Sequence, residues 1–379
     1  MDHLIPFDEV AAPKGCQATL STTYAIHPPF LEEIFLRRLE AAGCRYNLVL
    51  ADARQLGTAL EQSSTRPQGA GTRYGLLPMA GAAAFHPKIV LQVGPERGRL
   101  VVGSHNLTFS AFMSNREATA VLDVPQPARD PDGAGVLAAA WQFVRDTLVG
   151  EAMPEDARGL VDALAAVAPW LREADPSRQA GDVRFLAAYP GGEPLLDQLR
   201  QIFPASPHYW LATAPFVDTD LALADALTAG TGDVRLAADP AHAAVPDGPG
   251  PDSLRWLDGT AAGPSGGVLH AKILYAPAAG GDDLLVIGSA NPSAPAWLPG
   301  RRRNAEAVIV LTGAPARETA TTMALPALAD APPISEPDLR RMAAAHTAQA
   351  GARAAEPTAR AAWTAVPVDG ALVVAGAAM

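Results

Sequence analysis

The chain has 379 residues, of which 49% are hydrophobic and 18% are charged, and its formal net charge is −11. This composition is typical of a globular protein long enough for two domains, and it excludes a disordered chain. The negative charge argues against a broad surface that binds polyanions without specificity, although a small basic cleft remains compatible with it.

Compartment and cofactors follow from what the sequence lacks. Residues 1–15 carry no apolar core of signal-peptide length, and no stretch reaches the roughly 18 apolar residues that span a bilayer. We therefore expect a soluble, cytoplasmic protein without a membrane span. Cys16 and Cys44 are too few for a disulfide framework, so we expect free buried thiols. Without Cys-x-x-Cys or His-x-x-x-His spacing, we expect neither a metal site nor a cofactor.

The first half of the chain predicts alternating strands and helices. A strand at 18–23 is followed by a helix that ends at Gly43 and by a second strand at 46–50. His86 and Lys88 are two residues apart, so on a strand both would point to one face. Pro87 conflicts with a central strand because it lacks the ladder donor. A short apolar strand at 100–102 leads into Gly-Ser and a turn.

Two apolar stripes at helical spacing separate the halves, and we interpret them as helices that cover the sheet. The stripes are Val136, Ala140, Val144 and Leu148, then Leu160, Leu164, Val167 and Leu171.

The second half repeats the layout of the first. It predicts a strand at 209–214, a helix at 221–227, and strands at 234–238 and 284–287. Residues 239–267 are rich in glycine and proline and predict a long loop near the second motif. Beyond residue 313 the sequence says little, except that 336–350 predicts a packing helix.

The most informative feature is a repeated motif. Lysine occurs three times in the chain, and two of the three stand in Phe85-His86-Pro87-Lys88 and Leu269-His270-Ala271-Lys272. Random placement would give roughly 0.06 His-x-Lys triplets in this composition, so two of them indicate a duplication.

Further polar residues recur after each triplet in the same order. Gly-Ser-x-Asn follows both, which gives Ser104 with Asn106, and Ser289 with Asn291. An Asn-x-Glu-Ala segment comes next, which gives Glu117 and Glu306. We expect the histidines, lysines, asparagines and glutamates to be catalytic, and the two serines to contact substrate. The run Arg301-Arg302-Arg303 is a candidate grip for substrate phosphates. Trp297, Phe109 and Phe112 are candidates for stacking on a base, although we expect them to pack in the core.

These residues suit substitution at a phosphodiester. Two lysines and two asparagine amides would neutralise the phosphate oxygens. One imidazole can attack phosphorus and form a phosphohistidine, while the other protonates the leaving oxygen and then activates water. A glutamate on the second nitrogen of each imidazole would fix its tautomer.

The two His-x-Lys…Gly-Ser-x-Asn elements resemble the phospholipase D superfamily, over about residues 18–313. The resemblance implies an α/β fold of two tandem repeats, each a mixed β-sheet flanked by helices, with one active site at their interface. It also implies that His86 is the nucleophile and His270 the general acid and base. The family's usual aspartate, five positions after each lysine, is replaced by Val93 and Pro277. The tyrosyl-DNA phosphodiesterase branch shares this loss, and segment 289–297 is similar to that branch.

The expected organisation is a first repeat at 1–125, a helical connector at 126–184, a second repeat at 185–313 and an alanine- and proline-rich extension at 314–379. We expect a phosphodiesterase whose partner is a phosphodiester substrate, with nucleic acid favoured. One chain supplies both motif copies, so a monomer suffices for one site. A phospholipase D-type lipid hydrolase or transferase stays open, as does a catalytically silent binding module in a defence or repair assembly.

Overall fold

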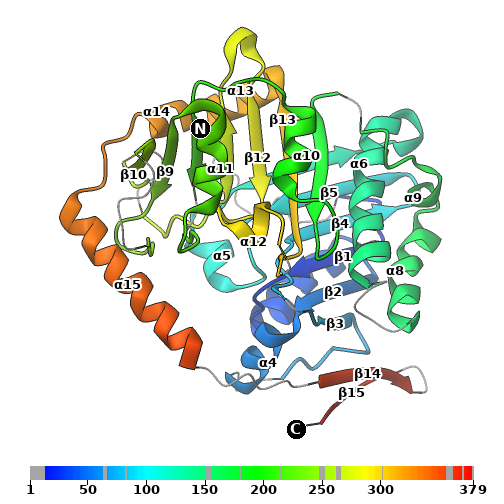
Figure 1. The fold of residues 1–379 in the computed structure, drawn as a ribbon. Helices are drawn as coiled ribbons and strands as arrows, with labels where there is room; N and C mark the ends of the chain where they lie inside the picture. Colours follow the sequence, from blue (N-terminus) through cyan, green and yellow to red (C-terminus); the bar gives the residue numbers. More distant parts are fainter. Residues whose placement is uncertain are drawn as a thin grey trace.

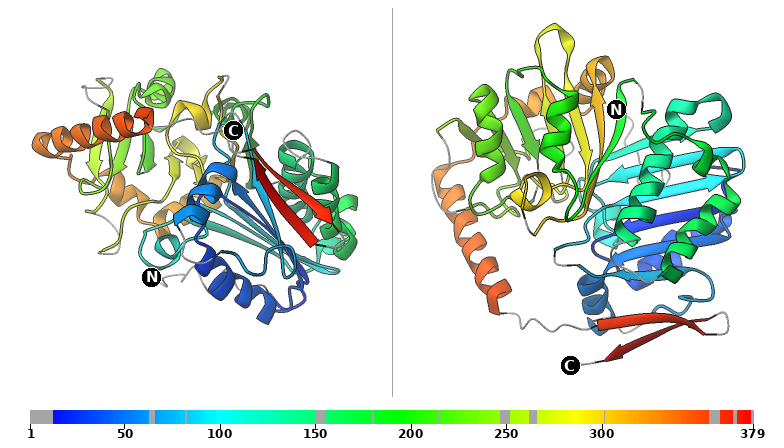
Figure 2. Two further views of the ribbon diagram at one scale, coloured as in Figure 1. Left: turned by 90° about the horizontal axis from the view of Figure 1, so that it is seen from below. Right: turned by 45° about the vertical axis from the view of Figure 1, so that its right-hand side comes forward.

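The computed structural model describes residues 13–62, 66–81, 83–149, 155–179, 181–213, 215–246, 252–261, 266–300, 302–355, 362–368 and 371–377. Two large mixed sheets with flanking helices make up the body of the molecule (Figures 1 and 2). The two-repeat α/β fold expected from the sequence is confirmed.

The first sheet has the strand order β3-β2-β1-β4-β5-β6. Strands β1, β2 and β3 are parallel, whereas β4, β5 and β6 continue the sheet with antiparallel pairings. The bounds of the strands are β1 (Ala18–Thr23), β2 (Tyr46–Asp52), β3 (Gly75–Met79), β4 (Ile89–Gly94), β5 (Arg97–Gly103) and β6 (Thr119–Val124).

The second sheet repeats this order and these directions as β10-β9-β8-β11-β12-β13, with β7 added beyond β13. Each strand from β1 to β6 therefore has a counterpart between β8 and β13. The bounds are β7 (Val183–Ala188), β8 (Trp210–Thr213), β9 (Val234–Ala238), β10 (Leu254–Asp258), β11 (Ile273–Ala276), β12 (Leu284–Gly288) and β13 (Glu306–Thr312).

Helices cover both faces of the sheets because alternate strand residues are apolar on each face. In β2, Leu48 and Leu50 pack toward α6 and α8, while Val49 and Ala51 pack toward the helices at residues 28–41. Figure 1 shows α6, α8 and α9 together beside the first sheet. The helices of the first half and the connector are α2 (Pro28–Phe30), π-helix η1 (Leu31–Phe35), α3 (Leu36–Ala41), α4 (Ala53–Gln62), α5 (Phe109–Met113), 3₁₀ turn η2 (Pro127–Arg129), α6 (Pro131–Gln142), π-helix η3 (Phe143–Val149), α8 (Glu155–Val167) and α9 (Trp170–Glu173).

The second sheet is covered in the same way, by α10–α12 on one face and by α13 and α14 on the other. These helices are α10 (Leu195–Ile202), α11 (Ala222–Thr231), α12 (Ala294–Trp297), α13 (Gly313–Thr322) and α14 (Leu325–Ala329), with a 3₁₀ turn η4 (Ala279–Gly281). Helix α15 (Glu336–Ala355) and a hairpin of β14 (Ala362–Val368) with β15 (Ala371–Ala377) follow. The connector stripes and the helix near 336 are confirmed.

The two halves share one apolar core. Ala307 and Ile309 of β13 lie in the same buried cluster as Leu91, Leu100 and Val102 of the first sheet. Burial of this interface by the hydrophobic effect holds the two sheets together. Segments from the two motif copies are thereby brought to one place in the molecule.

Two local expectations were wrong. Residues 239–267 are not a continuous loop, because β10 (Leu254–Asp258) forms the edge of the second sheet. The His-x-Lys triplets do not lie within strands either. Lys88 directly precedes β4, and Lys272 directly precedes β11.

This position of the triplets removes the conflict over Pro87. The Thr22 hydroxyl donates to the Pro87 carbonyl at 2.9 Å and accepts the Ile89 N–H at 2.9 Å. A side chain thus replaces the ladder bonds where Pro87 has no N–H to offer. In the second half, the Thr213 hydroxyl donates to the Ala271 carbonyl at 2.9 Å.

Replacement of Thr22 by valine tests this bridge. Thr22 is 2% exposed, so Thr22→Val leaves a buried N–H and a buried carbonyl without their partner. We expect the free energy of unfolding in chemical denaturation to fall by about 2 kcal/mol. Thr22→Ser keeps the hydroxyl and should lose less than half as much; equal losses in both variants would contradict the bridge.

Candidate active site

The two histidines are each held by a glutamate of the opposite half. Nδ1 of His86 lies 2.9 Å from Oε2 of Glu306, and Nδ1 of His270 lies 2.9 Å from Oε2 of Glu117. An ionised carboxylate can only accept, so Nδ1 of each ring is the donor. Each Nε2 then carries a lone pair, as a nucleophile or a general base requires, and Nε2 of His270 lies 3.5 Å from Nζ of Lys272.

Backbone bonds between the halves set this crossed arrangement. The His86 N–H donates to the Ala305 carbonyl at 3.0 Å, next to Glu306. Likewise, the His270 N–H donates to the Arg116 carbonyl at 2.9 Å, next to Glu117. Isolated bridges pair Phe85 with Ala305 and Arg116 with Leu269. Each His-x-Lys segment of one half therefore pairs with the glutamate segment of the other half.

Serine and asparagine side chains fix both glutamates. The Ser104 hydroxyl donates to Glu117 and accepts the Ala118 N–H at 3.0 Å. In the second half, Ser289 donates to Glu306 and accepts the Ala307 N–H at 3.0 Å. The second oxygen of each carboxylate accepts from the asparagine two residues earlier: Asn115 to Glu117 and Asn304 to Glu306, both at 3.1 Å.

The position of the two serines thus differs from the sequence expectation, in which they contact substrate. Both are completely buried, and their described hydroxyl contacts are with the glutamate and the neighbouring backbone. Their observed role is to hold the carboxylate that orients an imidazole. Asn115 and Asn304 have the matching role, although the sequence prediction assigned them none.

Burial and the neighbouring positive charges act in opposite directions on the pKa values of the two glutamates. Burial alone would raise the pKa of Glu117, but the His270 bond and the positive charges nearby lower it to about 2. Burial would also raise the pKa of Glu306, yet His86 and Lys88 hold it below its usual range. Both carboxylates are therefore ionised near neutral pH.

Burial lowers the pKa of the His86 imidazole to about 4, against the opposing pull of Glu306. The pKa of His270 is lowered as well, mainly by burial. The side chains of His86 and His270 keep 10% and 17% of their surface exposed, so a small part of each ring reaches solvent. Neutral imidazoles with one unprotonated nitrogen result.

Both motif lysines lie in the same site. Nζ of Lys88 donates to the His86 carbonyl at 2.9 Å, and Nζ of Lys272 donates to the His270 carbonyl at 3.0 Å. Burial lowers the pKa of Lys272 to about 8, and burial together with the Lys272 charge lowers the pKa of Lys88 well below its usual range. Nζ of Lys272 also lies 3.3 Å from Nδ1 of His270. When protonated, two buried ammonium groups suit an anionic oxygen.

The motif asparagines differ between the halves. Oδ1 of Asn106 accepts the Ala25 N–H at 3.2 Å, which leaves the amide NH₂ as the group to offer. Oδ1 of Asn291 is buried and has no hydrogen-bond partner among the described residues. A buried polar atom without a partner is costly, and such atoms concentrate at functional sites.

The arginine run separates into different roles. Arg303 is 4% exposed and donates to the carbonyls of Tyr189 and Gly192, so it fastens a turn. Arg302 is exposed, and Arg301 lies outside the described residues. Arg303 therefore does not have the role expected from the sequence, which was to bind substrate phosphates. For Arg302 this role remains a prediction.

Tyr24 and Asp52 also border the site, although the sequence analysis singled out neither. The Tyr24 ring packs edge-on against the His86 ring, with centroids 5.0 Å apart. Asp52 accepts the Phe85 N–H at 3.0 Å and so fixes the residue before His86. The sequence signal that was available for Asp52 is its place as a polar residue at the end of β2.

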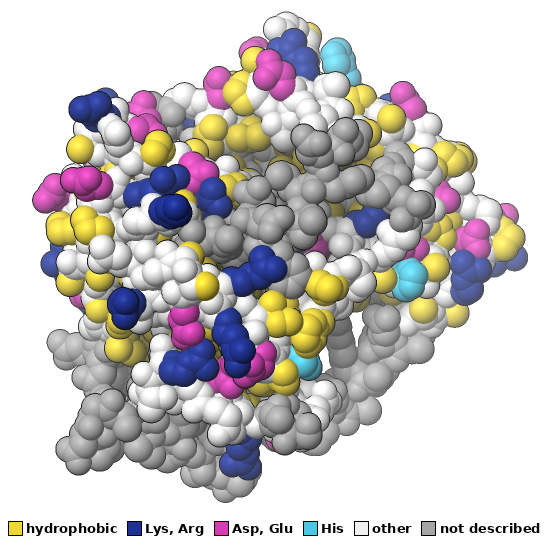
Figure 3. Space-filling model, turned by 180° about the vertical axis from the view of Figure 1, so that it is seen from behind, with side chains coloured by type: hydrophobic (Ala, Val, Ile, Leu, Met, Phe, Trp, Pro, Cys, Tyr) yellow, Lys and Arg dark blue, Asp and Glu magenta, His cyan; other side chains and the backbone are white. Residues whose placement is uncertain are grey.

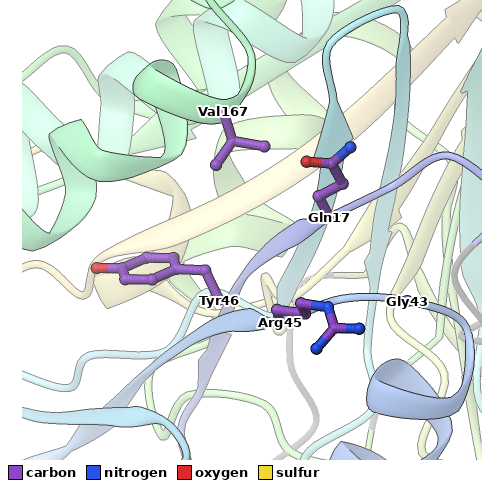
Figure 4. A pocket seen from close by; sticks show the side chains of 5 residues that line it. All are labelled: Gln17, Gly43, Arg45, Tyr46 and Val167. Carbon is purple, nitrogen blue, oxygen red and sulfur yellow. The ribbon is translucent and has the colours of Figure 1, made fainter.

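One cavity among the described residues lies away from this site. It measures about 510 Å³ and is lined by Gln17, Gly43, Arg45, Tyr46 and Val167 (Figure 4). Gln17, Arg45 and Tyr46 stand where β1 and β2 begin, whereas the segment of His86 lies beside Thr22 and Asp52, where those strands end. The crossed histidines therefore define the candidate active site.

Known proteins are similar to this chain in fold. No model of a protein family matches the sequence, and no curated protein matches it. A mutant of yeast tyrosyl-DNA phosphodiesterase superposes with a TM-score of 0.51 at 10% identity, over 81% of this chain and 84% of that chain. Phosphatidylserine synthase of Haemophilus influenzae superposes with a TM-score of 0.52 at 11% identity, over 92% of this chain and 90% of that chain.

Both of these proteins are members of the phospholipase D superfamily. The chain has the fold of that superfamily, and the resemblance carried by its two motif copies is confirmed at the level of architecture. Among the described helices, none is long and apolar enough to cross a membrane.

The lowered pKa of Lys272 predicts how the site binds a simple anion. Lys272 is a cation below about pH 8 and neutral above it. We therefore expect the affinity for sulfate, measured by isothermal titration calorimetry, to fall as the pH rises from 7 to 9. Lys272→Arg should keep its affinity to higher pH because a guanidinium stays charged. Lys14→Arg is the control; a flat wild-type profile would contradict the assignment.

Proposed function

We propose that the protein is a phosphodiesterase that acts on nucleic acid through a phosphohistidine intermediate, with the charges of its own residues and no metal ion. The observation that carries this proposal is the pair of imidazoles that are each oriented through Nδ1 by a buried glutamate of the other half. Two motif lysines stand beside them. Oriented nitrogen nucleophiles next to buried cations match the needs of attack on an anionic phosphorus.

The proposed reaction has two steps. In the first, Nε2 of His86 attacks phosphorus, a P–N bond forms, and the P–O bond to the leaving group breaks as His270 gives that oxygen a proton. In the second, His270 removes a proton from water, the hydroxide attacks phosphorus, and the P–N bond breaks to release His86. Glu306 and Glu117 stabilise whichever imidazole is positive in each step.

Nucleic acid is the proposed substrate class because both motifs lack the aspartate that phospholipases usually keep. Val93 is fully buried in β4 and Pro277 directly follows β11, so neither position supplies a polar group to the site. The similarity of segment 289–297 to the tyrosyl-DNA phosphodiesterase branch supports the same choice.

The first test is cleavage of a fluorescent single-stranded oligonucleotide in EDTA. We expect turnover by the wild-type protein and a loss on the order of 10³-fold or more in His86→Ala, which has no nucleophile. His270→Ala should accumulate a phosphoprotein, because its second step lacks the base. His208→Ala is the matched control, since exposed His208 stands near the start of β8, at the end remote from the site.

Each alternative has its own outcome. Hydrolysis of mixed lipid vesicles without cleavage of oligonucleotides would replace this proposal with a lipid enzyme. If no diester is cleaved and His86→Ala leaves the cellular phenotype unchanged, a silent binding module is the better account.

A further inference from the structure

Exposed aromatic rings stand close to the site in both halves. Among the described residues, the large hydrophobic side chains that are exposed are Phe109 (42%), Met113 (67%) and Phe216 (40%). Phe112 and Trp297 are buried, as expected from the sequence. Phe109 is not a core residue, so that part of the prediction was wrong.

Phe109 is anchored directly beyond the first motif asparagine. The Thr108 N–H donates to the Asn106 carbonyl at 2.9 Å, and the Thr108 hydroxyl caps α5 by accepting the Ala111 N–H at 3.3 Å. Three residues of chain reach at most about 11 Å, so the Phe109 backbone lies close to that of Asn106. The ring itself is held from behind by Phe30 and His27, with centroids 5.3 Å and 5.1 Å away.

Phe216 has a related place in the second half. It lies three residues beyond Thr213, whose hydroxyl is bonded to the carbonyl between His270 and Lys272. The residue at the same distance beyond Thr22 in the first half is Ala25, and its N–H is bonded to Asn106. Each half therefore presents one solvent-exposed ring within a few residues of its own catalytic segment.

A flat, fixed ring suits a flat partner better than a flexible acyl chain. A nucleobase stacks on an aromatic face whatever its sequence, and single-stranded nucleic acids are commonly bound in this way. A lipid surface would instead favour a broad apolar area with basic residues around it. In the view from behind, yellow hydrophobic side chains are interspersed with those of Lys, Arg, Asp and Glu (Figure 3).

We propose that Phe109 and Phe216 are stacking platforms for the bases on either side of the reacting phosphate, and that the substrate is single-stranded. This inference rests on the proposed function of the same site, because the lysines and histidines supply the contacts with the phosphate. Stacking on both rings would splay the strand open at the scissile bond. Base pairing in a duplex would prevent it.

The test compares a strand that carries bases with an abasic strand of the same backbone charge. Binding of fluorescent oligothymidylate and of an abasic strand of equal length is measured by anisotropy in the His86→Ala background, so that no cleavage intervenes. We expect the parent to prefer oligothymidylate over the abasic strand. Adding Phe109→Ala or Phe216→Ala should weaken oligothymidylate binding about 10-fold while affecting the abasic strand much less. Phe109→Leu keeps an apolar side chain but removes the ring, and it should lose most of the preference.

Met113→Ala is the control, because Met113 is exposed on α5 but has no planar group. Thermal unfolding shows whether each variant is folded. Equal binding of both strands by the parent, or no change in the preference with either Phe variant, would overturn the stacking proposal. So would binding to phosphatidylglycerol vesicles that depends on Phe109 in the absence of oligothymidylate binding.

The stacking proposal and the proposed function fail in different ways. Base-dependent binding without cleavage by the wild-type protein would keep the platforms and refute the phosphodiesterase. Cleavage of methyl 4-nitrophenyl phosphate with base-independent binding would keep the phosphodiesterase and refute the platforms.

Discussion

The crossed histidine–glutamate pairs are the constraint on which the rest of the site depends. Glu306 is completely buried and ionised, and a buried charge costs several kcal/mol unless it is paired and hydrogen-bonded. Its own half supplies Ser289 and Asn304, and the other half supplies His86. The same holds for Glu117 with the roles exchanged. Neither half can satisfy its carboxylate alone, so docking of the halves and formation of the site are one event.

This constraint explains why the two His-x-Lys triplets stand before strands rather than within them. The segments at His86 and His270 each use backbone groups to pair with the opposite half. A residue inside a central strand has those groups committed to its own sheet. The triplets therefore lie outside the hydrogen-bond ladder of their own sheet. The hydroxyls of Thr22 and Thr213 bond to the triplet backbone in place of the missing ladder bonds.

The sequence was sufficient for the fold and for most of the site because the information was duplicated. Two copies of a rare triplet identified the histidines and lysines, and periodic apolar residues located the strands at 18–23 and 46–50. The crossing could not be predicted, since spacing alone does not say whether Glu117 faces His86 or His270. The serines were expected to contact substrate, and their place in the sequence does not show that they donate to Glu117 and Glu306 instead. Edge strand β10 was missed because glycine and proline surround it.

The balance of charge in the site shows how substrate could complete it. Glu117 and Glu306 carry one negative charge each, and Lys88 and Lys272 balance them when both are protonated, with both imidazoles neutral. A phosphodiester adds one more negative charge to this buried site, and a nearby negative charge raises the pKa of an imidazole. Protonation of one imidazole restores the balance. His270 is the better placed for it, because its side chain is more exposed than that of His86 and Glu117 already accepts from its Nδ1. In the proposed mechanism, substrate binding would thus charge His270 and leave the more deeply buried His86 neutral, so the asymmetry that the proposed reaction needs would arise from the substrate's own charge.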